Sequence, residues 1–123
     1  MTIYLKRDDV MKKLFISCPM KGRTKENIEN TMKKMHEIAE CTFDQKLEII
    51  NSYIYDEGIS DDLNKRVYFL GKSIQLMSQA DYFIGIKAPH DWIGCLIETI
   101  VAYSYDIEHS VVDADIVMND LEK

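Results

Sequence analysis

Short apolar runs alternate with amphipathic segments along this chain, and that order limits the folds it can adopt. The runs at 13–17, 47–50, 82–86 and 110–112 predict buried strands, and the segments between them predict helices. Strands that alternate with helices across short loops form βαβ units, whose right-handed crossovers give a parallel sheet. We therefore expect an α/β fold, a single-domain Rossmann-like (flavodoxin-like) parallel sheet of four to five strands with helices on both faces.

The spacing of apolar residues also places the helices. Thr24 is the predicted N-cap of a first helix, whose apolar positions are Ile28, Met32, Met35 and Ala39. Ser60 or Asp61 is expected to open a second helix, and steps of four and three residues join its apolar positions Leu63, Val67, Leu70, Ile74 and Met77. A third helix is predicted over 94–107, and residues 115–121 predict a short final helix or a tail.

Composition narrows the class of protein. The 123 residues suit one domain over 13–123, preceded by an N-terminal extension over 1–12. The net charge of −6 argues against nucleic acid or an anionic membrane as partner, and no apolar run approaches the ~20 residues of a membrane span. The three cysteines are widely spaced and form no metal-ligand pattern. We expect a cytoplasmic protein without metal, cofactor or disulfide.

Parallel α/β sheets bind ligands at the carboxyl ends of their strands, so three loops are informative: 18–23, 51–58 and 87–94. Lys21, Gly22 and Arg23 offer two cations and flexible backbone between a strand and a helix, a place where a phosphate can be held. Trp92 either stacks on a base or covers the core or a subunit interface, and both interpretations stay open.

Glu98 is an acid in an otherwise apolar helical run. If the helix starts near Gly94, Glu98 lies in its first turn, where the helix dipole favours the ionised carboxylate. The alternative is a first-turn glutamate that only complements the dipole. Apolar neighbours on nearly every side favour a role in a site.

Three stretches, "LFISCPMKGR", "SQADYFIGI" and "GCLIETIVAY", occur in this order along the chain. With them the chain resembles, over roughly residues 13–113, the nucleoside 2-deoxyribosyltransferase-like superfamily, in particular its small phage and bacterial members. This superfamily also includes deoxynucleoside 5′-monophosphate N-glycosidases.

The resemblance implies that Glu98 is the nucleophile that cleaves an N-glycosidic bond by hydrolysis or transfer, and that the loop 21–23 cradles a 5′-phosphate. The candidate catalytic residues are Glu98 and Asp91. The candidate substrate-binding residues are Cys18, Pro19, Met20, Lys21, Gly22, Arg23, Tyr53, His90, Trp92, Gly94 and Cys95. The expected partner is a small nucleotide or nucleoside, and the small size and the resemblance predict a homo-oligomer.

The chain departs from the family pattern at two polar positions. Ser73 replaces a common aspartate, and Trp92 replaces an aspartate or serine that contacts the ligand, with Asp91 shifted by one residue. Asp91 or His90 would then have to supply the proton to the leaving base. The alternative function is a catalytically inactive nucleotide-binding protein, such as a phage protein that sequesters a nucleotide-derived signal.

Overall fold

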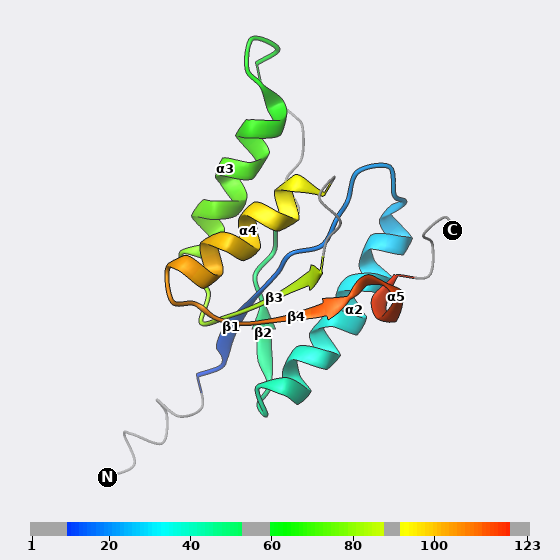
Figure 1. The fold of residues 1–123 in the computed structure, drawn as a ribbon, viewed down its shortest axis with the longest axis vertical. Coiled ribbons are helices and arrows are strands. Elements are labelled where there is room, and N and C mark those ends of the chain that lie inside the picture. Colours follow the sequence, from blue (N-terminus) through cyan, green and yellow to red (C-terminus); the bar gives the residue numbers. More distant parts are fainter. Residues whose placement is uncertain (1–9, 53–59, 88–91, 119–123) are drawn as a thin grey trace.

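The fold is a parallel sheet with helices on both faces (Figure 1). We describe residues 10–52, 60–87 and 92–118 of a computed structural model. The four strands are β1 (Lys12–Ile16), β2 (Leu47–Ile49), β3 (Tyr82–Lys87) and β4 (Glu108–Asp113), in the order β2-β1-β3-β4. All three strand pairs are parallel, which confirms the predicted α/β class with a strand count of four.

The helices divide between the two faces. They are α2 (Lys25–Thr42), α3 (Lys65–Met77), α4 (Ile93–Ser104) and α5 (Ala114–Val117). Helices α2 and α5 cover one face, where a core cluster includes Leu14, Ile16 and Met35. Helices α3 and α4 cover the other face, around Phe15 and Phe83. Because side chains alternate along a strand, neighbouring residues of β1 supply the two cores.

Two helix starts show how capping residues set the boundaries. Thr24 caps α2 as predicted, since its Oγ1 accepts a hydrogen bond from the Asn27 N–H at 3.1 Å. The expected start of α3 at Ser60 or Asp61 is wrong. Asn64 is the N-cap, and its Oδ1 accepts from the Val67 N–H. Ser60 instead accepts two hydrogen bonds from the residues that follow, which makes a turn ahead of the helix.

Helix α4 packs closely on β3 because position 85 lacks a side chain. A Cβ on Gly85 would lie 2.9 Å from both Phe83 Cε1 and Thr99 Oγ1. The absent side chain therefore lets α4 approach the sheet. Gly85 follows Ile84, whose carbonyl accepts a hydrogen bond from the Ser17 N–H at 2.9 Å. The close approach thus occurs beside the end of β1.

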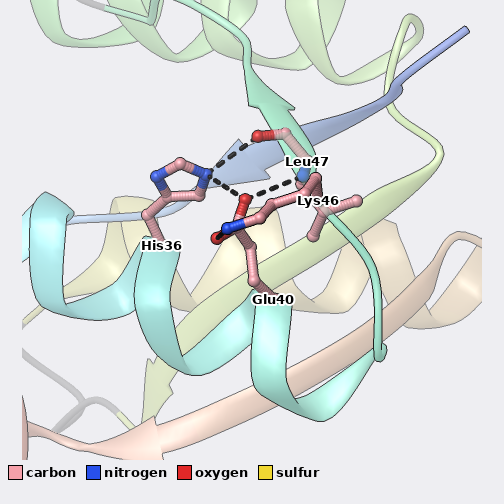
Figure 2. A network of polar contacts seen from close by, with 4 residues as sticks. All are labelled: His36, Glu40, Lys46 and Leu47. Carbon is pink, nitrogen blue, oxygen red and sulfur yellow. Dashed lines mark hydrogen bonds and ion pairs between the residues drawn. The ribbon is translucent and has the colours of Figure 1, made fainter.

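A polar cluster joins the end of α2 to the start of β2, as Figure 2 shows. Glu40 Oε2 accepts a hydrogen bond from the Leu47 N–H at 2.9 Å, and His36 Nε2 lies 3.1 Å from that oxygen and 2.8 Å from the Leu47 carbonyl oxygen. The Leu47 N–H, with nearby His36 and Lys46, lowers the pKa of the Glu40 carboxyl. The cluster fixes where the chain enters the edge strand.

Two apolar positions of the predicted second helix face solvent. Leu63 and Val67 expose 49% and 62% of their surface. Helix α3 contacts α4 more than it contacts the sheet, so part of its apolar face stays uncovered. None of the described helices is both long and apolar enough to cross a membrane.

Candidate functional site

Glu98 lies at the carboxyl end of the sheet with its side chain directed inward. It is 9% exposed, and its Oε1 accepts a hydrogen bond of 2.5 Å from the Ser17 hydroxyl. Ser17 directly follows β1, and α4 directly follows the loop after β3. The strand order reverses between β1 and β3, and doubly wound sheets bind ligands at such a switch point.

A third element reaches the same carboxyl. Ser73 of α3, which is half-buried, also makes a side-chain hydrogen bond with Glu98. A hydroxyl here contacts the carboxyl without adding a second negative charge. Three elements, β1, α3 and α4, therefore converge on Glu98.

The environment of Glu98 favours its protonated form. Burial raises the pKa of this carboxyl, and the hydrogen bonds from Ser17 and Ser73 oppose that rise with smaller effects. The expectation that the helix dipole favours the ionised form is wrong. Helix α4 begins at Ile93, so Glu98 is in its second turn and not among the first-turn amides.

Cys95 lies one turn before Glu98, and Ser17 is a hydrogen-bond partner of both side chains. The thiol is buried, and burial raises its pKa to about 12, although a hydrogen bond with Ser17 acts in the opposite direction. Cys95 is therefore a neutral thiol at physiological pH. Cys18 is also buried and lies near enough for its charge to affect the Cys95 thiol. The predicted site residues Cys18, Cys95 and Glu98 are thus brought together.

The basic loop after β1 has two different cations. Arg23 is half-buried, and its guanidinium donates to the Pro19 carbonyl at 2.8 Å and to Thr31 Oγ1 at 2.6 Å. It therefore ties the loop to α2. Lys21 and Gly22 are exposed, and Gly22 has a φ of 75°, a conformation that favours glycine. Lys21 is the cation of this loop that faces solvent.

Trp92 covers the core. It is the N-cap residue of α4, is half-buried, and packs with Met20 against the core cluster on the α2 face. Of the two open interpretations, this contact favours the covering role over base stacking. Gly94, in the first turn of α4, is exposed. Tyr53, His90 and Asp91 lie outside the described residues.

Two serines of this region were missed by the sequence analysis. Ser17 is the closest polar partner of Glu98. Ser52 is 7% exposed, and its hydroxyl has no hydrogen-bond partner among the described residues. It follows β2 and lies two residues after Ile50, which packs in the core on the α3 and α4 face. The parallel pairing runs as far as Leu14 with Ile49, three residues before Ser17 and Ser52 respectively. The sequence signal that could have identified both serines is a hydroxyl residue at the end of an otherwise apolar strand.

Two hollows of the described surface lie elsewhere. One of about 540 Å³ is lined by Met77, Val101 and Ile107 among others, and another of about 550 Å³ lies around Tyr103 and His109. Both adjoin the last turn of α4, whereas Glu98 faces the sheet from its second turn. We place the candidate site by the convergence of polar groups on Glu98, not by these hollows. Within the described segments, no cluster of side chains is suited to hold a metal ion.

These features define a doubly wound α/β domain with a buried carboxyl at its switch point. No known family model, curated protein or solved structure matches the chain.

Proposed function

We propose that this protein cleaves the N-glycosidic bond of a nucleoside 5′-monophosphate or nucleoside, with Glu98 as nucleophile. The observation that supports this proposal is the buried Glu98 carboxyl, held by hydroxyls of Ser17 and Ser73 at the switch point of the sheet. Burial of a carboxyl costs free energy. Its polar partners within the described part of the chain are neutral hydroxyls. They do not neutralise an ionised Glu98, so its negative charge can stabilise a cationic transition state.

The chemistry follows the pattern of a retaining glycosidase. An oxygen of ionised Glu98 bonds to the anomeric carbon C1′ while the C1′–N bond breaks and its electron pair leaves with the base. The departing base takes up a proton from solvent. Water then attacks C1′, gives up a proton to solvent and releases the carboxylate, which gives hydrolysis, whereas attack by a second base gives transfer.

The protein must ionise Glu98 for that step. The hydroxyls of Ser17 and Ser73 favour the carboxylate, and positive charge that develops on the sugar at the transition state favours it further. The exposed Lys21, beside the start of α2, is the residue proposed to contact a 5′-phosphate. Arg23 supports this contact by holding the loop.

A second candidate function is binding of a nucleotide without catalysis. Burial, which raises the pKa of Glu98, favours this function, because it makes the carboxylate that a nucleophile requires harder to form. In this form the protein holds a nucleotide or a nucleotide-derived signal, as a phage protein that sequesters such a signal would do. For either function we propose a cytoplasmic homo-oligomer, in keeping with the three free cysteines.

The test is whether the protein releases free base from a panel of nucleoside 5′-monophosphates and nucleosides, with the released base measured by chromatography. We expect release by the wild type and loss of several orders of magnitude in Glu98→Gln, whose amide oxygen still accepts from Ser17. Lys21→Ala should slow the release of base from monophosphates but not from nucleosides. If no base is released while a nucleotide raises the melting temperature, the glycosidase proposal is overturned in favour of the binder.

A further inference from the structure

Ser52 is a buried serine at the carboxyl end of the sheet. Only 7% of its surface is exposed, and its Oγ has no hydrogen-bond partner among the described residues. Burying an unpaired hydroxyl costs free energy, and native proteins leave few such groups unpaired. We therefore expect the partner of Ser52 to lie outside the described chain.

The side chain of Ser52 lies on the same face of the sheet as Glu98. The Ile50 N–H donates to the Leu14 carbonyl at 2.9 Å, so the chain stays beside β1 after β2 has ended. Ile50 packs in the core cluster of the α3 and α4 face. Burial alternates along the next residues, with Asn51 exposed between two buried side chains. Ser52 is therefore directed to the face that α3 and α4 cover.

The other two serines of this face already have partners. Ser17 donates to Glu98 Oε1 at 2.5 Å and also makes a side-chain hydrogen bond with Cys95. Ser73 makes a hydrogen bond with Glu98. Among these three serines, Ser52 is the one whose hydroxyl can still both donate and accept within the described part of the chain.

The geometry of the proposed attack selects the group of the ligand that Ser52 can meet. In a β-nucleoside the base projects from one face of the sugar ring, and the C2′ and C3′ hydroxyls of ribose project from the other. A nucleophile that displaces the base bonds to C1′ from the side opposite the base. Glu98 would thus approach the ring on its hydroxyl face, while the base points away and the 5′-phosphate extends to Lys21.

We propose that the Ser52 hydroxyl binds a hydroxyl of the substrate sugar, on C2′ or C3′, and makes the site selective for nucleotides that carry it. A sugar hydroxyl both donates and accepts, so it can pair with either function of the serine. The proposal rests on the proposed function, because it takes Glu98 as the group that attacks C1′.

The test measures base release by the wild type and Ser52→Ala from three nucleoside 5′-monophosphates of one base, with ribose, 2′-deoxyribose or 3′-deoxyribose as the sugar. The measured quantity is the ratio of kcat/KM between variant and wild type on each substrate, since a 2′-hydroxyl also changes the intrinsic lability of the bond. We expect Ser52→Ala to lower kcat/KM roughly 3- to 10-fold on the substrates that carry the contacted hydroxyl and to leave it unchanged on the one that lacks it.

The substrate that is insensitive to the variant identifies the carbon whose hydroxyl Ser52 binds. An equal effect of Ser52→Ala on all three substrates, or no effect on any of them, would overturn the proposal and leave the proposed activity intact. A wild type that releases no base from any of the three would overturn the activity and the proposal together.

Melting of the free protein gives a measurement that needs no substrate. Ser52→Ala removes an unpaired buried hydroxyl and should raise the melting temperature by roughly 2–6 °C. Ser78→Ala is the matched control, because the Ser78 hydroxyl at the end of α3 donates to the Gln75 carbonyl. We expect this control to show no rise in melting temperature and no change in base release. A Ser52→Ala variant that melts at or below the wild-type temperature would show that the Ser52 hydroxyl is paired in the free protein, and would overturn the proposal.

Discussion

Gly85→Ala tests the account of how α4 is positioned. The added Cβ would lie 2.9 Å from Phe83 Cε1 and from Thr99 Oγ1, whereas ordinary contacts begin near 3.4 Å. Neither neighbour is free to move away: Phe83 is fully buried, and the Thr99 hydroxyl donates to the Cys95 carbonyl at 2.9 Å. The variant must therefore push α4 off β3 by about half an ångström or force Phe83 out of its position, at a cost of about 1–3 kcal/mol.

Thermal unfolding measures this cost. For a domain of this size we expect the melting temperature to fall by about 4–12 °C. Gly71→Ala is the matched control, because nothing lies within 4 Å of its added Cβ and the residue is inside α3. Alanine there should raise stability by about 0.5–1 kcal/mol. A Gly85→Ala variant as stable as the wild type would refute the close approach of α4.

Three further predictions concern charged groups. Because burial raises the folded-state pKa of Glu98, the wild type should lose stability as pH rises from the unfolded pKa through the folded one, by about 1.4 kcal/mol for each unit between them. Urea unfolding of Glu98→Gln should lack this loss, and parallel pH curves for the two proteins would contradict it. The lowered pKa of Glu40 has the opposite effect on stability. The stability that this carboxylate contributes is present above its unfolded-state pKa and is lost as pH falls through its folded-state pKa. Glu40→Gln should therefore be less stable than wild type at neutral pH and equal to it in acid, and equal stability at every pH would show that the cluster at Leu47 contributes nothing. Arg23→Ala removes the hydrogen bonds to Pro19 and Thr31 and should cost about 1–3 kcal/mol, with faster hydrogen exchange in the loop 18–23; unchanged exchange rates would exclude the tying role of Arg23.

The strands could be predicted from the sequence because short continuous apolar runs between loops are typical of buried strands of a parallel sheet. Their observed bounds differ from the expected ones by no more than two residues. The start of α3 could not be predicted, since Ser60, Asp61 and Asn64 are all good caps. Only tertiary packing decides which of them begins the helix.

The orientation of α4 shows the limit of apolar pattern alone. Its buried residues are Cys95, Glu98 and Ala102, which are small or polar, while the more apolar stripe that includes Ile100 faces solvent. Hydrophobicity by itself would turn that stripe inward. Small residues allow α4 to lie close to the sheet, and the larger apolar residues face solvent.

The candidate site was only partly predictable for a related reason. Glu98 stood out because an acid interrupts an apolar run, but nothing local indicates that Ser17 and Ser73 reach it. Those contacts depend on the crossover that brings α3 and α4 over the end of β1. The burial that raises the pKa of Glu98, opposite in direction to the expected effect of the helix dipole, likewise follows from tertiary packing.

The nucleophilic role of Glu98 can be tested most directly by intact-mass and peptide analysis of the protein quenched during reaction with a nucleoside 5′-monophosphate. The proposed role predicts a covalent sugar phosphate on the peptide that contains Glu98, with free base released in at least an equal amount and no adduct on Glu98→Gln. Base release without an adduct at Glu98, or an adduct that persists in Glu98→Gln, would contradict it.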